Sequence, residues 1–365
     1  MTPDAWLRLL AAAGYGSRRW IRALRRSGSA DALISHNHGW LRRNGLSDEE
    51  AARLAAGSAV VPPTWRDWLA GPGHELITFE SEHYPQRLAE LVDAPLALWV
   101  AGRDTSLLGH PQVAIVGSRH PTANGREVAR SLAASLSGAG VTVTSGLALG
   151  IDAASHAGAL TGAGTTIAIL GNGIDHVYPA ANRRLARQIR EHGLIVSEYP
   201  PGIPVRAPQF PRRNRIIAGL SLGTVVVEAT RRSGSLITAR LAVESGREVF
   251  AVPGSIHSPL SKGCHTLIRD GATLVETVEE ILIEIAPQLT EAVHRASSRD
   301  ITQSATVLPG PLDEHLGYSP ITLDSLASAT GLTAAELSSM LLHLEIQGKI
   351  EALPGGRYCR LSKRA

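Results

Sequence analysis

Three arginines and one asparagine fall within four residues of the chain, close behind an aromatic ring. The segment 210–215 reads FPRRNR and is followed by the apolar pair Ile216-Ile217. Guanidinium groups bind phosphates through paired hydrogen bonds, and a phenylalanine ring offers a face on which a base can stack. The sequence holds only 3 phenylalanines, so a ring beside this cluster is informative. The pattern predicts contact with a nucleotide chain.

Glycine turns follow several apolar runs in the middle of the chain. They lie at Gly117, at Gly146 with Gly150, at Gly171 with Gly173, and at Ser233-Gly234-Ser235. Glycine at the carboxyl end of a strand lets the backbone approach a ligand, and the N–H groups of the following helix attract anions. Arg119 adds a positive charge beside the first turn. We expect these turns to line one edge of a sheet and to form a phosphate site.

Carboxylates near these turns leave alternatives open. The arginines of 210–215 could form salt bridges to a carboxylate such as Glu228, and Arg213 or Arg215 could do so while also binding a ligand. Asp152 and Glu228 could instead be the acid and base that cleave a nucleotide N-glycosidic bond. The plainer interpretation is that Asp152 caps a helix and that Glu228 pairs with an arginine.

Other catalytic and metal-binding patterns are missing from the sequence. It contains no Gly-x-x-x-x-Gly-Lys-Ser/Thr phosphate loop, and the glycine after Gly117 is Gly125, too distant for the dinucleotide fingerprint. His156 has no second histidine or cysteine nearby, so it is expected to be packed or hydrogen-bonded rather than a metal ligand. We predict no catalytic residue, no metal and no cofactor.

Apolar runs alternate with helical stretches or loops through the same region. They cover residues 113–116, 141–143, 166–170, 194–196, 224–227, 248–252 and 273–275. Runs that are nearly continuous in apolar residues are typical of parallel strands covered on both faces. The alternation predicts a doubly wound α/β fold with a mainly parallel sheet. Two more strands, near 76–79 and 96–100, are expected in a subdomain that leads into the sheet.

Weaker patterns divide the rest of the chain. Residues 1–62 are expected to form short helices, one opened by the capping box Ser47–Glu50. Residues 63–286 form the α/β domain, 287–310 a Ser- and Thr-containing linker, and 311–365 a helix-helix-hairpin, which is a winged-helix pattern. Its would-be recognition helix, 333–347, contains Glu336 and Glu345 but no Arg or Lys. We therefore expect this tail to contact protein rather than to read duplex DNA.

Composition places mild limits on function. The 365 residues carry a formal charge of +3 and the pI is near 9.1, which is too weakly basic to prove a nucleic-acid partner. Arg18, Arg22 and Arg25 share one helix face, which could touch a phosphate backbone or could simply be solvated. Cys264 and Cys359 suggest neither a metal site nor a disulfide framework, and no apolar run has the length of a membrane span. We expect a cytoplasmic protein without a membrane span.

Several motifs occur in unbroken order over residues 75–285. They are Gly117-Ser118-Arg119, SGLALGID at 145–152, LGNGID at 170–175 with Tyr178-Pro179, SEYPPG at 197–202, FPRRNR at 210–215, RSGS at 232–235 and VPG at 252–254. This order resembles the DprA/Smf family of bacterial DNA-processing proteins, and FPRRNR with SGLALGID is its most specific part. The N-terminal helices resemble the sterile-alpha-motif-like domain of that family, the middle its extended Rossmann-like domain, and the tail its winged-helix domain.

The resemblance implies a role without catalysis. It implies that the chain binds and protects incoming single-stranded DNA during natural transformation, helps to load RecA recombinase onto it, and forms a homodimer through the Rossmann-like domain. Arg119 matches the phosphate-gripping arginine of the family and Phe210 an aromatic that meets a base. Some members have lysines around the pocket; this chain has none between Gly117 and Leu260, so Arg183 and Arg184 could take their place.

Motifs and resemblance together give one set of predicted DNA-binding residues. The set is Gly117, Ser118, Arg119, Ser145, Gly146, Gly171, Phe210, Arg212, Arg213, Asn214, Arg215, Ser233, Gly234 and Ser235. The alternative function is a nucleotide phosphoribohydrolase on a lysine-decarboxylase-like Rossmann scaffold. That class carries a Pro-Gly-Gly-x-Gly-Thr stretch, which this chain lacks.

Overall fold

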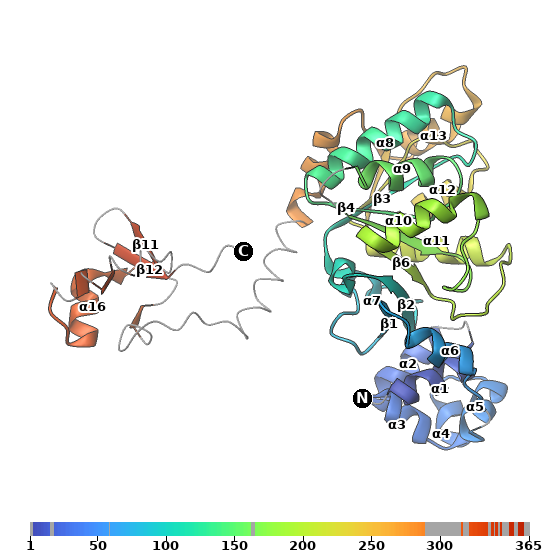
Figure 1. The fold of residues 1–365 in the computed structure, drawn as a ribbon, viewed down its shortest axis with the longest axis horizontal. Coiled ribbons are helices and arrows are strands. Elements are labelled where there is room, and N and C mark those ends of the chain that lie inside the picture. The colour runs from blue at the N-terminus through green and yellow to red at the C-terminus, as the bar shows by residue number, and fades with distance from the viewer. Residues whose placement is uncertain are drawn as a thin grey trace. The chain divides into compact units, whose positions relative to one another are not determined.

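The computed structural model describes most of the chain. The described residues are 3–14, 18–57, 59–161, 165–288, 315–316, 321–334, 337–338, 340–341, 344, 350–353 and 357–360. They belong to two compact units, 1–289 and 290–365, which are both drawn in Figure 1. Each unit has hydrophobic clusters of its own.

Within the described residues, a nine-stranded sheet organises the first unit. The strands are β1 (His74–Thr78), β2 (Ala97–Gly102), β3 (Gln112–Val116), β4 (Thr142–Ser145), β5 (Thr166–Leu170), β6 (Leu194–Ser197), β7 (Gly223–Val226), β8 (Glu248–Ala251) and β9 (Thr273–Leu274). Their spatial order is β1-β2-β6-β5-β4-β3-β7-β8-β9. The pairs β1–β2 and β2–β6 are antiparallel and the other pairs are parallel. The predicted doubly wound, mainly parallel α/β sheet is confirmed.

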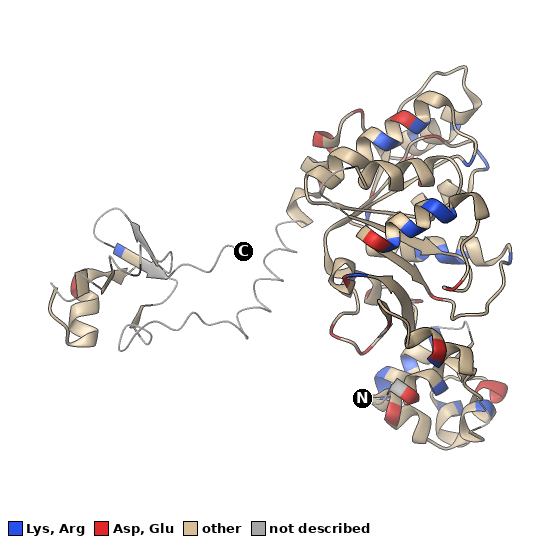
Figure 2. Ribbon diagram, viewed as in Figure 1, with Lys and Arg blue, Asp and Glu red and all other residues tan. Residues whose placement is uncertain are grey.

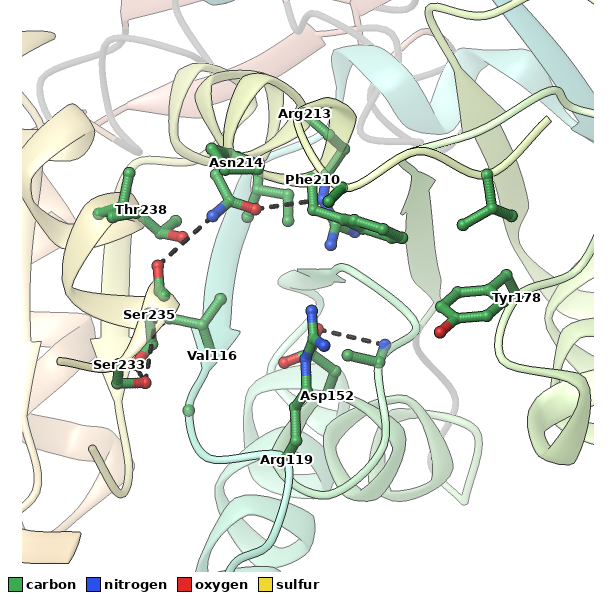
Figure 3. A pocket seen from close by; sticks show the side chains of 18 residues that line it. Val116, Arg119, Asp152, Tyr178, Phe210, Arg213, Asn214, Ser233, Ser235 and Thr238 are labelled. Atoms are coloured by element: carbon green, nitrogen blue, oxygen red, sulfur yellow. Dashed lines mark hydrogen bonds between the residues drawn. The ribbon is translucent and has the colours of Figure 1, made fainter. Parts of the chain in front are cut away.

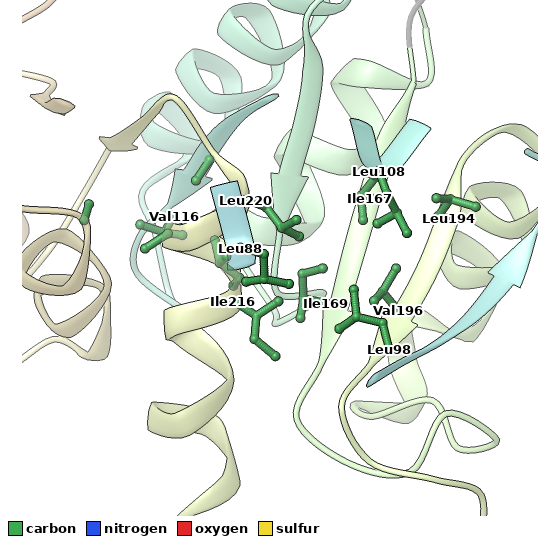
Figure 4. Packing of buried hydrophobic residues seen from close by; sticks show 14 of the residues in the cluster. Leu88, Leu98, Leu108, Val116, Ile167, Ile169, Leu194, Val196, Ile216 and Leu220 are labelled. Atoms are coloured by element: carbon green, nitrogen blue, oxygen red, sulfur yellow. The ribbon is translucent and has the colours of Figure 1, made fainter. Parts of the chain in front are cut away.

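Helices cover both faces of this sheet. On one face α11 (Gln209–Leu220), α12 (Gly234–Glu244) and α13 (Lys262–Arg269) pack on strand residues such as Val116 and Ile169 (Figure 4). On the other face α8 (Ala123–Gly138), α9 (Ile151–Ala159) and residues 278–288 pack on residues such as Ile115. Side chains alternate between faces along a strand, so Ile115 and Val116 belong to different cores. Because both faces are covered, all residues of β3 and β5 are buried.

Short helices precede the sheet and pack against its first two strands. They are α1 (Pro3–Ala13), α2 (Arg18–Ser27), α3 (Ala30–Ser35), α4 (His38–Arg43), α5 (Asp48–Ala55) and α6 (Pro63–Leu69). Their core contains Trp6 and Trp20, and it continues into Leu96 beside β2. The capping box at Ser47 and Glu50 is present. The helices and the sheet form one compact unit, and the domain boundary after residue 62 stays a prediction.

The first unit also contains α7 (Gln86–Ala89), α10 (Arg183–His192) and 3-10 turns at Thr105–Gly109, Ala180–Asn182 and Pro259–Ser261. α10 packs on β5, β6 and β2 through Ala186 and Ile189. None of the helices in the described ranges combines the length and the apolar composition that a bilayer crossing needs.

The second unit contains a small sheet and a helix. Strands β10 (Ile321–Thr322), β12 (Arg357–Arg360) and β11 (Ile350–Leu353) lie side by side in that order, and helix α16 (Leu323–Thr330) follows β10. Leu326, Leu337 and Leu341 share its core. Glu336 and Glu345, which led us to expect a helix that does not read DNA, lie outside the described residues. Of the predicted linker 287–310, only 287 and 288 are described.

Candidate nucleic-acid interface

The order of strands reverses between β3 and β7, and a cleft opens at their carboxyl ends. The strands β4, β5 and β6 follow one another on one side of β3, and the next strand, β7, lies on the other side of β3. Such a switch point leaves space between the loops that leave the two strands. The cleft there encloses about 570 Å³, and it is bordered by the loop after β3, by α11 and by the start of α12 (Figure 3).

One face of α11 forms a wall of the cleft. The residues of this helix that line it include Phe210, Arg213, Asn214 and Ile217. Their spacing of three, four and seven residues places them on one side of a helix. Asn214 donates a hydrogen bond to the backbone oxygen of Gly234 at 3.4 Å, which ties this wall to the start of α12.

Arg119 enters the cleft from the opposite side. Its guanidinium carbon lies 5.7 Å from the centre of the Phe210 ring, within the range of a cation–π contact. Arg119 is exposed, and no described carboxylate forms a salt bridge with it. An arginine without a carboxylate partner keeps its hydrogen-bond donors available for an anionic ligand.

Two aromatic rings lie together beside this arginine. The Tyr178 ring centre is 5.7 Å from that of Phe210, with the ring planes inclined by 42°. Arg119, Tyr178, Phe210 and Arg213 also border a smaller hollow of about 60 Å³. The arrangement places aromatic faces next to a cation, as sites for single-stranded nucleic acids do.

Arg213 reaches the cleft but is held by the protein. Its Nη1 donates to the backbone oxygens of Gly146, at 2.6 Å, and Ile169. Burial lowers the pKa of Arg213 to about 10, although the nearby Asp152 carboxylate opposes that shift. The guanidinium therefore stays charged at neutral pH and contributes positive potential to the floor of the cleft.

Arg212 and Arg215 lie on another side of α11 and do not line the cleft. Arg212 Nε lies 3.1 Å from Glu198 Oε2, and Arg215 Nη2 lies 2.5 Å from Glu198 Oε1. Arg215 also pairs with Asp93, at 3.2 Å. The alternative of salt bridges is therefore realised for these two arginines, with Glu198 and Asp93 rather than Glu228 as partners.

Several predicted contact groups are engaged inside the protein. The buried Ser145 hydroxyl donates to Ile115 O at 2.7 Å, and the N–H of Gly146 donates to Asp152 Oδ2 at 3.1 Å. Ser118 donates its N–H to Glu228 O at 2.7 Å. Gly171 is buried, and a Cβ built there would lie 2.9 Å from the Phe210 ring.

The predicted DNA-binding residues thus fall into two groups, those that line the cleft and those that do not. Lining the cleft are Gly117, Arg119, Phe210, Arg213, Asn214, Ser233, Gly234 and Ser235. Outside that lining are Ser118, Ser145, Gly146, Gly171, Arg212 and Arg215, of which Gly146 borders the smaller hollow. Arg183 and Arg184 are exposed on α10 and line neither space.

The two carboxylates considered as an acid and a base are not brought together. Asp152 accepts from the N–H groups of Gly146 and Ala148, and burial raises its pKa although Arg213 and these bonds act against that. Glu228 accepts from the Thr122 N–H and hydroxyl, at 2.9 and 2.6 Å, instead of pairing with an arginine. Asp152 lines the cleft and Glu228 does not.

His156 is buried between α9 and the sheet. Its Nδ1 lies 2.7 Å from the Thr166 hydroxyl, which itself donates to Val143 O, so the neutral imidazole donates from Nδ1. Burial lowers the pKa of His156 to about 3. The expectation of a packed, hydrogen-bonded histidine is confirmed. Among the described residues, no group of three or more His, Cys, Asp or Glu is suited to a metal ion.

Tyr178 is a lining residue that the predicted set omits. It is 44% exposed and follows the glycine turn after β5. An exposed aromatic in a loop after a strand's carboxyl end is the signal that would have placed it with Phe210. Its position depends on how the 171–179 loop folds toward α11, which the spacing of the sequence does not specify.

Comparisons with known families identify two regions. The model of a family described as DNA recombination-mediator protein A matches residues 75–286, and that of the DprA winged helix domain matches residues 299–356. Protein Smf of Escherichia coli is 40% identical over 370 residues, which cover 99% of this chain and 96% of that protein. The DNA processing protein DprA of Streptococcus pneumoniae is 48% identical over 201 residues, covering 55% of this chain and 71% of that protein.

Solved structures show the same architecture. The X-ray structure of DprA from Streptococcus pneumoniae superposes with a TM-score of 0.70 and 36% identity, covering 78% of this chain and 99% of that chain. A structure of DNA processing protein A from Helicobacter pylori, described by its single-stranded DNA binding mode, has a TM-score of 0.53 and 30% identity. It covers 59% of this chain and 97% of that chain.

Proposed function

The chain belongs to the DNA recombination-mediator protein A family, and we propose from this premise that it binds single-stranded DNA in the cleft between β3 and β7. The family is one of DNA processing and recombination. The observation that carries the proposal is the exposed Arg119 guanidinium above the Phe210 ring at the carboxyl edge of the sheet. A cation and a ring at that spacing suit one phosphate and one base of a flexible strand.

The chemistry of the cleft favours binding without base specificity and without catalysis. Every base has a face that can stack on Phe210 or Tyr178, and phosphate contacts carry no sequence information. Asp152 is committed to two backbone N–H groups and to the neighbourhood of Arg213. With Glu228 outside the cleft, no second carboxylate of the described lining could complete an acid–base pair with it.

We extend the proposal to the biological setting of the family. In it, the chain protects incoming single-stranded DNA during natural transformation in the cytoplasm and helps a RecA-type recombinase to load onto it. The support is the family membership and the sequence tolerance of the cleft, since a mediator must accept any strand. A strand-exchange assay with a RecA-type recombinase tests this extension, and Arg119→Ala should remove the stimulation that wild type gives.

We also propose a homodimer formed at the β9 end of the sheet. β9 is an edge strand, whose unpaired backbone groups are open to association. Leu274 of β9 is 44% exposed, and exposed apolar side chains also occur in the segments before and after this strand, at Ile256 (67%) and Ile283 (71%). Large apolar side chains left in water favour association with a partner.

Arg119→Ala is the first test of the DNA site. Removing one phosphate contact should make the slope of log affinity against log salt shallower by about 0.7 for a single strand. Loss of a charged hydrogen bond should weaken binding by about 1.5–3 kcal/mol. The measurement is a salt titration of binding to an oligonucleotide and to its duplex, with wild type and variant side by side.

Arg103→Ala is the matched control for this titration. Arg103 is exposed and follows β2, and it lines no part of the cleft. The control variant loses the same charge as Arg119→Ala, but outside the cleft. Its slope of log affinity against log salt should therefore stay near that of wild type. Equal, weak binding of both DNA forms that is indifferent to Arg119→Ala would refute the proposed site.

A further inference from the structure

A second cleft lies far from the proposed DNA site, between α2 and the turn after α7. It encloses about 400 Å³, and four arginines of one helix line it: Arg18, Arg22, Arg25 and Arg26. They follow one another at intervals of four, three and one residues, so they occupy neighbouring positions along about two turns of α2. Figure 2 marks the Lys and Arg positions of the amino-terminal helices in blue. Positive charge on the amino-terminal helices is therefore concentrated along this cleft.

The positive charge of this cleft is not neutralised. All four arginines are exposed. Arg25 donates to the backbone oxygen of Ala89 and lies 5.5 Å from the centre of the Phe79 ring, and Arg26 donates to the side-chain oxygen of Asn44, so these partners are all neutral. The carboxylate on the rim, Glu90, is instead paired with Arg247 at 2.7 Å. In the described part of the chain, no salt bridge joins a carboxylate to any of the four arginines.

The two clefts lie at opposite edges of the sheet. Arg247 comes directly before β8, so Glu90 lies at the amino edge of the parallel strands. The carboxyl end of α11 reaches the same place, because Gly219 packs against Leu88 and Leu91. The other end of α11 forms the first cleft, and a helix of 12 residues is about 18 Å long. One strand segment short enough to fill the first cleft cannot also fill the second.

The second cleft has the chemistry of a phosphate site. Its lining combines guanidinium groups with aliphatic side chains such as Leu91 and Val92, and it includes no aromatic ring. Without a ring on which bases could stack, it would hold the backbone rather than the bases. Arginine forks match phosphate oxygens, and several in a row suit a polyanion more than a single ion.

We propose that this cleft is a second, sequence-independent site for the phosphate backbone of nucleic acid. The inference deepens the proposed function and rests on it in one respect. A strand held in the first cleft presents its own continuing backbone at high effective concentration to a second site on the same protein. The same effect is not available to an acidic protein segment, which makes the strand the favoured occupant.

Arg18→Ala/Arg22→Ala tests this site with little risk to the fold. Both side chains are exposed, and neither forms a hydrogen bond or a salt bridge with another described residue. Binding is measured by salt titration with oligothymidylates of about 6 and about 30 nucleotides, because single-strand sites span about 4–16 nucleotides. We expect the slope for the long oligonucleotide to become shallower by about 1.4, since each lost contact removes about 0.7. The short oligonucleotide should bind as it does to wild type.

Arg8→Ala/Arg43→Ala is the matched control, because it removes two exposed arginines of the same helical bundle outside the cleft. Equal slopes for the test and control variants with the long oligonucleotide would overturn the second site. Loss of binding in Arg119→Ala with no effect at α2 would leave the proposed function standing and remove only this inference. Weaker binding in the α2 variant, with no effect of Arg119→Ala, would support the second site and remove the proposed site in the first cleft.

Polyglutamate serves as the second probe. If its binding, but not that of the long oligonucleotide, depends on Arg18 and Arg22, the cleft takes an acidic protein segment and the proposal is wrong. If the oligonucleotide alone depends on them, the proposal stands.

Discussion

Phe210 and Arg213 occupy space that glycines leave open at the ends of neighbouring strands. A Cβ at Gly146 would lie 2.2 Å from Arg213 Nη1, and one at Gly171 would lie 2.9 Å from the Phe210 ring. The sequence predicts these two turns correctly as glycine-dependent. It attributes the glycines to close approach of a ligand, whereas in the structure they admit side chains of α11. The identity of that neighbour depends on tertiary packing, which no local pattern carries.

Substitution of Arg215 is expected to affect the stability of the fold, whereas substitution of Arg119 is expected to affect DNA binding. The sequence places both in contact with phosphate, but the Arg215 side chain is only 6% exposed and pairs with Glu198 and Asp93. Removing one partner leaves the Glu198 carboxylate buried with only Arg212 to compensate. Arg215→Ala should therefore lower the free energy of unfolding by about 3 kcal/mol. Urea unfolding of wild type and variant measures this.

Arg119→Ala is the comparison for that measurement. The Arg119 side chain is exposed, so its removal should leave the urea midpoint unchanged. Arg215→Ala protein that remains folded in the titration should keep the salt slope of wild type. A variant with the midpoint of wild type and a shallower slope would return Arg215 to the DNA-contacting set.

At the scale of elements, α11 explains why the arginine cluster divides. In the sequence, the segment FPRRNR comes just before the apolar pair Ile216-Ile217. In the structure the helix begins at Gln209. Proline is tolerated in a first turn, where the backbone N–H has no partner within the helix. Once Phe210 to Arg215 are helical, the 3.6-residue period sends Phe210 and Arg213 to the cleft and Arg212 and Arg215 to Glu198.

The contact between α9 and β5 predicts a pH-dependent stability. The pKa of His156 is lowered to about 3 by burial, against about 6.5 in an unfolded chain. Its contribution is therefore fully present above about pH 6.5 and is lost progressively as the pH falls toward 3. Between pH 7 and pH 5, wild type should lose about 2 kcal/mol more than His156→Gln, which cannot titrate. Urea midpoints at the two pH values give the difference.

Other groups titrate in both proteins and cancel in that comparison. Glutamine can still donate toward the Thr166 hydroxyl, so the variant should fold. Parallel losses of stability in the two proteins would show that His156 is protonated without cost in the folded state.

At the scale of the whole molecule, the sequence predicts the strands of the sheet but not how the amino-terminal helices pack against it. Every predicted apolar run became a strand whose ends lie within two residues of the expected ones, because parallel strands buried on both faces leave a continuous signal. The packing of the amino-terminal helices on β1 and β2 was not predicted. It depends on pairs such as Trp6 with Glu80, whose indole N–H donates to the carboxylate at 3.2 Å across 74 residues.

The proposed homodimer makes a prediction at this scale. Ile256→Asp replaces an exposed apolar side chain, in the segment between β8 and β9, by a charged one. Burying an unpaired carboxylate in an interface is unfavourable, so the variant should dissociate to monomers. Sedimentation analysis of wild type and variant at the same concentrations measures the mass of each.

Val60→Asp is the control for this experiment. Val60 is 80% exposed and comes just before α6, in a part of the chain distant in sequence from β9. It should behave as wild type. A wild type that sediments as a monomer, or an Ile256→Asp variant that remains dimeric, would remove this interface from consideration.

The cleft contains guanidinium groups where many anion sites have histidines or lysines, and this affects how a strand can leave. Burial lowers the pKa of Arg213 only to about 10, so this guanidinium group stays charged throughout the range of cellular pH. A modest change of pH therefore leaves this positive charge, and the affinity that depends on it, unchanged. At constant salt, a strand bound in the proposed site would therefore be released by competition, when another protein displaces its nucleotides one after another.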